Sequence, residues 1–177
     1  MEKHEICALL DETLQGAADG IFEHLGVAVE YGEESETEVH DFACSIGFTS
    51  RTLRGNLTLT ARQAFLAETR PKELRHGEAS EFELCDWMGE LGNQVLGRFK
   101  NRLLATGNAI NLGTPAVLSG FQIQRRTDRM PLSAERLAKT EVGSLAMHVT
   151  AEATRDFAIT ESDEPSAVMP EGELELF

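Results

Sequence analysis

Apolar residues recur at offsets of three and four in two long segments of this chain. The first segment runs from Ile6 to Leu25 and is followed by Gly26. The second runs from about residue 81 to about residue 105, and its apolar positions are Leu84, Met88, Leu91, Val95, Phe99 and Leu103. Such offsets place side chains on one face of an α-helix. The pattern therefore predicts an N-terminal helix and a long central helix, the latter on the order of 36 Å long.

Shorter segments alternate between apolar and polar residues, as half-buried β-strands do. Residues 42–48 and 53–59 predict an antiparallel hairpin with a turn near residues 50–51. Further strands are expected at residues 116–124, with a break at Gly120, at residues 142–150, and as a short strand at residues 26–30. A short helix capped by Thr60 is expected to end near Glu68, before Pro71. Residues 125–140 are polar and carry Pro131, so the pattern predicts no strand there.

The order of these elements predicts a single α+β domain over residues 1–151. An antiparallel sheet is expected to pack against the N-terminal helix and the long helix. The long helix is expected to begin after Ser80, because Ser80 and Glu83 have the spacing of a capping box. Residues 152–177 are acidic and have few apolar positions, so they are expected to form a disordered tail.

The charge of the chain narrows the classes of partner. It has 30 acidic and 16 basic residues, which give a formal net charge of −14. This excess argues against a nucleic acid or an anionic membrane as partner, because both attract clustered Lys and Arg. No apolar run approaches the roughly 18 residues of a spanning helix, and the charged N-terminus predicts no signal peptide. A cytoplasmic location is therefore expected, with Cys7, Cys44 and Cys85 as reduced thiols.

A second face of the long helix carries residues that do not favour helix stability. Asp86, Glu90, Asn93 and Gly97 fall on one stripe. Asp86 and Glu90 are like charges at offset four, Glu90 has the neutral Gln94 four residues on, and Asn93 is a poor helix former. The glycines at positions 89, 92 and 97 each cost about 1 kcal/mol relative to alanine. A helix that accepts these costs is expected to present the carboxylate of Glu90 and the carboxamide of Asn93 to another molecule.

Other chemistries have weaker support in the sequence. No two histidines stand three or four positions apart, so a zinc site is not expected. There is no phosphate-binding loop, no dinucleotide-binding glycine motif and no nucleophile elbow. Trp87 fits either a packing role or a ligand platform. Glu12 and Gln15 in the first helix loosely echo Glu90 and Asn93, but they lack the surrounding glycines and are interpreted as ordinary helix surface.

A wider motif surrounds the exposed stripe of the long helix. Asp86 precedes the stretch Gly89-Glu-Leu-Gly-Asn-Gln-Val-Leu-Gly97, and Pro115 follows Asn93 by 22 positions, within Thr114-Pro-Ala-Val-Leu-Ser-Gly120. This combination resembles the signature of the CheC/CheX phosphatases. The predicted order of elements fits as well, so the resemblance covers roughly residues 5–151. With one convincing Glu-x-x-Asn motif, the chain is more similar to the CheX branch than to the two-site CheC branch.

The resemblance implies a reaction and a role for each residue. Members of this family dephosphorylate the phospho-aspartate of CheY-like response regulators. By resemblance, Asn93 orients the attacking water and Glu90 binds the regulator's lysine, while Asp86, Gly89 and Gly97 contact the partner. No cofactor of the chain's own is implied, because the regulator is expected to supply the magnesium ion. A homodimer is also implied, although the stretch after Gly120 is more polar here than the strand that such proteins have.

Two other interpretations stay open. A non-catalytic module of the same fold, which binds a response regulator or assembles a signalling complex, would need Glu90 but not strictly Asn93. An unrelated ligand-binding or structural domain would use the helix glycines for close packing alone. The sequence names neither the regulator nor its pathway. It also leaves open whether the protein is catalytic, whether a dimer exchanges strands and what the acidic tail does.

Overall fold

Two long helices and an antiparallel sheet make up the fold of the computed structural model, which describes residues 1–32, 39–72, 75, 77–124 and 131–159. In chain order its elements are α1 (Lys3–Leu25), β1 (Glu30–Gly32), β2 (His40–Thr49), β3 (Leu53–Ala61), α2 (Gln63–Thr69), α3 (Glu81–Ala105), β4 (Asn111–Leu112), β5 (Ala116–Ile123), β6 (Leu132–Thr140) and β7 (Gly143–Ala153). This is the α+β architecture that the hydrophobic pattern predicts.

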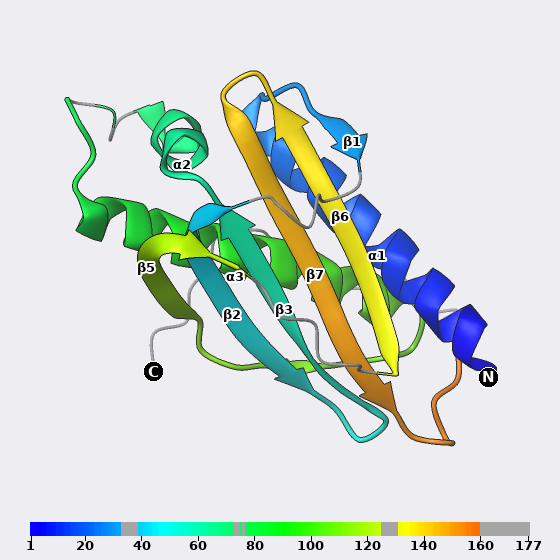
Figure 1. The fold of residues 1–177 in the computed structure, drawn as a ribbon. Coiled ribbons are helices and arrows are strands. Elements are labelled where there is room, and N and C mark those ends of the chain that lie inside the picture. The colour runs from blue at the N-terminus through cyan, green and yellow to red at the C-terminus, as the bar shows by residue number, and fades with distance from the viewer. Residues whose placement is uncertain (33–38, 73–74, 76, 125–130, 160–177) are drawn as a thin grey trace.

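The strands of the described residues form one seven-stranded sheet in the order β1-β6-β7-β3-β2-β4, with β5 also paired to β2. Every strand pair is antiparallel. Figure 1 shows α1 and α3 on the same face of this sheet, with α2 near one end. Helix α3 therefore crosses behind β2 and β3, and its outer surface faces away from the sheet.

The core lies between the sheet and the two long helices. All six residues of the apolar stripe on α3 are at most 1% exposed, and they are Leu84, Met88, Leu91, Val95, Phe99 and Leu103. Alternate residues of the central strands face them, including Cys44, Leu59 and Met147, which lie next to one another across β2, β3 and β7. Burial of one face of each element removes apolar surface from water and stabilises this layered arrangement.

The N-terminal helix, the long helix and the hairpin of β2 and β3 are confirmed, but two boundaries differ from the prediction. Thr60 does not cap the short helix. It lies within β3, opposite Ala43 of β2 and Ala146 of β7, and α2 begins only at Gln63. The short strand after α1 is β1 at Glu30–Gly32, rather than at residues 26–30, because its partner residues are Leu137 to Lys139 of β6.

The prediction of no strand in residues 125–140 is wrong for its second half. Residues 132–140 form β6, which pairs along its whole length with β7. The polar Arg136 lies in the same register as the core residue Met147, but its guanidinium binds Asp11 and Gln15 of α1. Paired in this way, an arginine can occupy a half-buried strand position. Residues 125–130 lie outside the described residues.

The folded part of the chain continues beyond residue 151. Strand β7 ends at Ala153, and Phe157 after it is only 2% exposed and belongs to the core. The carbonyl of Ala158 accepts a hydrogen bond from the side chain of Asn108, at the end of α3. The part of the expected tail from residue 160 onward lies outside the described residues.

Candidate functional site

The long helix α3 is held firmly at its N-terminus. Ser80 Oγ accepts from the backbone N–H of Glu83, and the Glu83 carboxylate accepts from the backbone N–H of Ser80, so the predicted capping box is confirmed. The hydrogen bonds from the Ser80 side chain and backbone lower the pKa of Glu83, and the nearby Arg70 adds to this effect. A capped helix with acidic residues in its first turn complements the helix dipole.

Trp87 fixes the same helix to its neighbour. The indole is 7% exposed, and its Nε1 donates to Thr69 Oγ1 of α2 at 3.1 Å. The Thr69 hydroxyl in turn donates to the carbonyl of Phe65. Of the two roles that the sequence left open for Trp87, the structure supports packing. Helix α3 is thus a rigid support for whatever its outer face presents.

The predicted polar stripe lies on the outer surface of α3. Asp86, Glu90 and Asn93 are exposed, and Gly97 is half-buried. Glu90 and Asn93 are one turn apart on a regular helix, a spacing that brings Cβ atoms to about 5–6 Å from each other. The carboxylate and the carboxamide are therefore available together to one partner.

The polar stripe has few bonds within its own chain. Among the described residues, Asp86 and Asn93 make no hydrogen bond or ion pair, and Glu90 accepts one hydrogen bond, from Gln94 Nε2 at 2.8 Å. The Asn93 carboxamide keeps its full capacity to donate and accept. The Glu90 carboxylate has no cation beside it in the part of the chain that the structure describes. The sequence marks Gln94 as a neutral neighbour of Glu90, but it does not reveal this bond.

The three glycines of α3 differ in their surroundings. A Cβ on Gly92 would lie 2.7 Å from Cys44 Sγ, so Gly92 lets the helix approach β2 and has a packing role. Gly89 is buried, and a Cβ there would lie 3.4 Å from Val117 of β5. A Cβ on Gly97 would meet nothing within 4 Å. Only at Gly97 is the space beside the helix open.

The two parts of the sequence motif meet in space. Strand β5, which follows Pro115, runs beside the first half of α3, as the contact between Gly89 and Val117 shows. Ser119 Oγ donates to the carboxylate of Glu81 in the first turn of α3. Strand β5 runs through Gly120 without the predicted break, but its pairing with β2 shifts in register there and Gln122 has a φ of 55°.

The echo of the motif in α1 has a structural role. Gln15 Nε2 donates to Asp19, and Gln15 Oε1 accepts from Arg136 of β6. Asp19 also accepts from the hydroxyl of Tyr31, at 2.8 Å. Burial and this hydrogen bond raise the pKa of Tyr31. These contacts tie α1 to β1 and β6, and they leave no acid–amide pair free for a partner.

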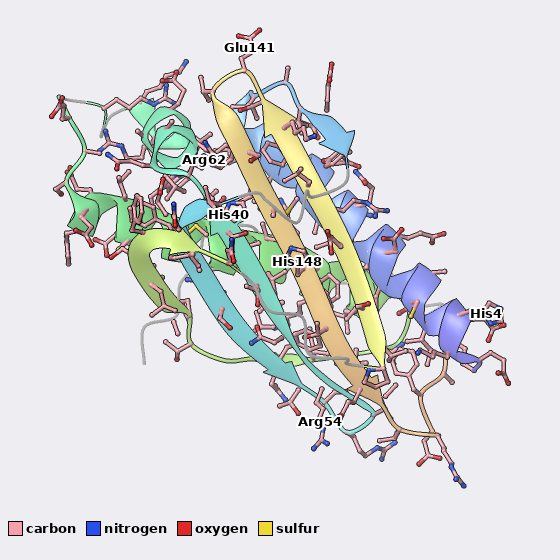
Figure 2. The ribbon with its side chains drawn as sticks, viewed as in Figure 1. His4, His40, Arg54, Arg62, Glu141 and His148 are labelled. Atoms are coloured by element: carbon pink, nitrogen blue, oxygen red, sulfur yellow. The ribbon has the colours of Figure 1, made fainter. Side chains whose placement is uncertain are left out.

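The described residues contain no group of three or more His, Cys, Asp and Glu side chains that could hold a metal ion. His148 of β7 is 3% exposed, and its Nδ1 lies 3.1 Å from the Glu135 carboxylate on the neighbouring strand β6 (Figure 2). The three cysteines are free thiols, and burial raises the pKa of Cys44 to about 11. Cys44 therefore stays protonated at neutral pH and serves as a packing residue.

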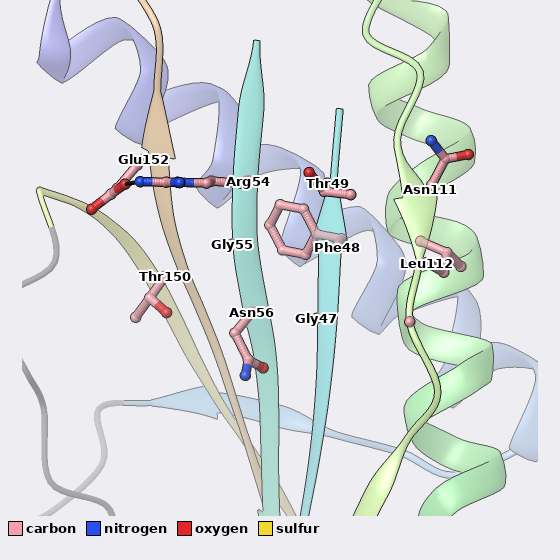
Figure 3. Close-up of a pocket in the computed structure, with 11 residues that line it drawn as sticks. Gly47, Phe48, Thr49, Arg54, Gly55, Asn56, Asn111, Leu112, Thr150 and Glu152 are labelled. Atoms are coloured by element: carbon pink, nitrogen blue, oxygen red, sulfur yellow. Dashed lines mark hydrogen bonds and ion pairs between the residues drawn. The ribbon is translucent and has the colours of Figure 1, made fainter. Parts of the chain in front are cut away.

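A groove of about 650 Å³ lies at the far end of the β2–β3 hairpin, away from the polar stripe. Figure 3 shows the side chains of Arg54 and Glu152 hydrogen-bonded to each other at the groove. Asn56 and Thr150 lie two residues further along the same two strands. Asn56 pairs with Gly47, which alternates with the core-facing Ile46, so the groove opens on the sheet face opposite α3. None of the residues predicted for the site lines this groove.

Within the part of the chain that the structure describes, no helix is long and apolar enough to cross a membrane.

The exposed stripe of α3 can bind a cation through Glu90 and can orient a water molecule through Asn93. A helix capped by Ser80 and packed on a sheet keeps these two groups in fixed relative positions. The arrangement therefore favours docking against a macromolecule rather than enclosure of a small ligand.

Two long helices packed on one antiparallel sheet make up the α+β fold of CheC-like proteins. The family model for the chemotaxis phosphatase CheX matches residues 42–135, which is more than half of the chain. This chain therefore belongs to the CheX family of chemotaxis phosphatases. The matched segment contains most of β2, and all of β3, α3 and the strand after Pro115. No curated protein matches the chain.

Solved structures of low sequence identity share the fold. A CheC-like superfamily protein from Shewanella sp. PV-4 has a TM-score of 0.73 at 20% identity, over 82% of this chain and 98% of that one. The chemotaxis protein CheX from Vibrio vulnificus has a TM-score of 0.71 at 18% identity, over 81% and 96%. A structure of a CheX–CheY–BeF3–Mg²⁺ complex from Borrelia burgdorferi has a TM-score of 0.64 at 14% identity, over 80% and 96%.

Proposed function

We propose that this protein hydrolyses the phospho-aspartate of a CheY-like response regulator. In this proposal Asn93 orients the attacking water, and Glu90 binds the lysine beside the regulator's phosphoryl group. Asp86 and Gly97 lie on the same surface and contact the regulator's loops, whereas Gly89 keeps β5 close to the helix behind this surface. The cytoplasmic location expected from the sequence stays a prediction.

One observation carries the proposal most directly. Asn93 is exposed on a rigid helix, and its carboxamide has no partner among the described residues. An asparagine in the middle of a helix is unfavourable unless its side chain finds a use. A free amide can accept a proton of a water molecule and donate to its oxygen or to a phosphoryl oxygen. The adjacent carboxylate of Glu90 supplies the attraction that brings a cationic partner group to the same place.

The reaction itself needs little chemistry from this chain. Water adds to phosphorus, the bond between phosphorus and the aspartyl oxygen breaks, and the products are inorganic phosphate and the free aspartate carboxylate. Catalysis of phosphoryl transfer comes mainly from alignment of the nucleophile and from stabilisation of charge on the equatorial oxygens. Asn93 provides the alignment. The response regulator provides the lysine and the magnesium ion that stabilise the charge.

The comparisons support this choice of partner. The solved complex of a CheX protein with CheY contains BeF3 and Mg²⁺, and its CheX shares the fold of this chain. We assign the magnesium ion to the regulator, in keeping with the Mg²⁺ present in that complex. Within this proposal, the chain's own residues bind, orient and align.

The test measures the loss of phosphate from a CheY-like regulator labelled on its aspartate. The wild-type protein should accelerate the decay. Asn93→Ala should reduce kcat by about 100-fold or more, because a misaligned water loses most of the positioning effect, and it should still bind the regulator. Glu90→Ala should raise KM by about tenfold or more through loss of a charge-assisted hydrogen bond.

Asn101→Ala is the matched control, because Asn101 is an exposed asparagine two turns further along α3. It should leave both constants unchanged. A wild-type protein that binds the regulator without accelerating the decay would favour the non-catalytic module. A wild-type protein that neither binds nor accelerates would overturn the proposal.

We also propose that two copies associate through β5. Within the described residues, β5 pairs with β2 only, and its Leu118 and Phe121 are 64% and 87% exposed. Large apolar side chains on a sheet edge are typical of surfaces that pair with another chain.

A further inference from the structure

A hydrogen bond holds the carboxylate of Glu90 in the free protein. Gln94 lies one turn further along α3, and its Nε2 donates to Glu90 Oε1 at 2.8 Å. The other end of the same amide, Gln94 Oε1, is buried and has no hydrogen-bond partner among the described residues. Turning the amide over would place its oxygen against the carboxylate, so the observed orientation is the one that Glu90 selects. The helix leaves a buried carbonyl oxygen unpaired and keeps a donor on Glu90.

The equivalent pair on α1 is built differently. Gln15 also donates a hydrogen bond to a carboxylate one turn away, that of Asp19 at 2.9 Å, but here the acid follows the glutamine in sequence. There the amide oxygen is paired with Arg136, and Asp19 accepts a second hydrogen bond from Tyr31. Both groups on α1 are thus used by the fold itself. On α3 the carboxylate of Glu90 receives one hydrogen bond from the described residues, and its second oxygen, Oε2, receives none from them.

The arginines of α3 that follow Gln94 do not neutralise Glu90. Arg98 and Arg102 lie against Gly20 and Gly16 of α1, where a Cβ would be 3.1 Å from the Arg98 side chain and 2.2 Å from the Arg102 guanidinium. No ion pair of Glu90 exists among the described residues. A neutral donor at position 94 therefore orients the carboxylate and preserves its charge. A lysine or arginine at this position would orient it but cancel that charge.

We propose that Gln94 is a positioning residue for the docking of the response regulator, because it fixes Glu90 Oε1 and directs Oε2 toward the incoming lysine. This inference rests on the function proposed above and adds a residue to it. Gln94 itself touches neither water nor phosphoryl group. Its effect is on binding, since a carboxylate that is already oriented loses less conformational freedom when the partner arrives.

The test uses three variants of the full chain with a CheY-like regulator. Gln94→Met removes the donor but keeps the length and the apolar packing of the side chain. It should raise KM by about fivefold, the equivalent of one hydrogen bond, and leave kcat within about twofold. Gln94→Lys should raise KM by about tenfold or more, because an internal ion pair competes with the partner's lysine and an added cation repels it. Affinity for the regulator bound to BeF3 and Mg²⁺ should fall in parallel.

Gln15→Met on α1 is the control for loss of an amide–carboxylate pair. It removes the contacts to Asp19 and Arg136, so it should lower the unfolding temperature and leave KM unchanged. Circular dichroism should give both Gln94 variants a melting temperature close to that of the wild type. If KM stays the same in Gln94→Met and Gln94→Lys, or if kcat falls in place of the affinity, the inference is wrong.

The two proposals fail in different ways. A wild-type protein that neither binds the regulator nor accelerates its dephosphorylation overturns the proposed function, and the role of Gln94 falls with it. A wild-type protein that does both, beside Gln94 variants that behave identically to it, overturns the role of Gln94 alone. Restored affinity in Gln94→Glu at low pH, where a protonated carboxyl can donate to Glu90, would give independent support.

Discussion

Gly92 and Gly97 lie on the same helix and serve opposite sides of it. The backbone of Gly92 sits so close to β2 that a Cβ would be 2.7 Å from Cys44 Sγ and 3.0 Å from Ile46 Cδ1. Gly97 has open space where a side chain would be. A glycine in a helix costs about 1 kcal/mol, and only at Gly92 does the packing of this chain explain that cost. At Gly97 no contact among the described residues explains it.

Gly97→Ala should separate stability from docking. Alanine is the better helix former by about 1 kcal/mol, so the unfolding temperature should rise by about 2–4 °C. The added methyl group stands one turn from Asn93 on the docking surface, so KM for the phosphorylated regulator should rise several-fold. Thermal denaturation and steady-state kinetics measure the two effects.

Gly92→Ala is the comparison for this prediction, since its methyl group would press on Cys44 and lower the unfolding temperature. A Gly97→Ala protein with raised stability and unchanged KM would remove Gly97 from the docking surface.

The periodicity of the sequence was enough to place Glu90 and Asn93 on one exposed face, because exposure on a helix follows from a period of 3.6 residues. It was not enough for Gly92 or Gln94. The role of Gly92 depends on Cys44, and that of Gln94 on which end of its amide turns inward. Packing between segments that are distant in the chain, as at Gly92, leaves no periodic signal in the sequence. The orientation of a side chain, as at Gln94, leaves none either.

At the scale of elements, the capping box of α3 fixes where the helix begins and therefore where the polar stripe with Glu90 and Asn93 lies. Ser80 and Glu83 close the first turn by reciprocal hydrogen bonds, and they lie two turns before Glu90. The sequence predicted this cap because its spacing is local. Strand β6 was missed for the opposite reason, since Arg136 interrupts its apolar alternation and is neutralised only by Asp11 of α1. Pairing across 125 residues is invisible to a local pattern.

Ser80→Ala should destabilise the protein and change its response to pH. Loss of an N-cap serine costs about 1 kcal/mol of unfolding free energy at pH 7. The Ser80 hydrogen bonds lower the pKa of Glu83 in the folded state, so this carboxylate stabilises the fold above its unfolded pKa. That contribution is lost as the pH falls through the folded pKa.

The variant should therefore show a shallower loss of stability on acidification than the wild type, measured by urea denaturation from pH 7 downward. Ser133→Ala, an exposed serine on β6, is the control and should follow the wild-type curve. Parallel curves for Ser80→Ala and the wild type would show that the hydroxyl does not control the ionisation of Glu83.

At the scale of the molecule, the two ends of the sheet differ. On one side β1 borders β6, and the Tyr31 hydroxyl connects that edge to α1. On the other side β5 and β4 border β2, and β5 carries Leu118 and Phe121 exposed to solvent. A sheet edge with large apolar side chains is a liability for a monomer unless another chain covers it.

Leu118→Glu combined with Phe121→Glu should convert a dimer into a monomer. The wild-type protein should elute in light-scattering chromatography at about twice its chain mass of 19.5 kDa, and the double variant at the mass of one chain. The two glutamates would be buried at the centre of the contact without partners, and the free energy of burying these charges destabilises the dimer. Both side chains are exposed in the single chain, so the variant should keep its fold and its melting temperature.

Val142→Glu, placed in the turn between β6 and β7, tests whether added charge alone has this effect, and it should leave the dimer intact. A double variant that still has the mass of two chains would exclude β5 as the contact, and a wild-type protein with the mass of one chain would exclude the dimer.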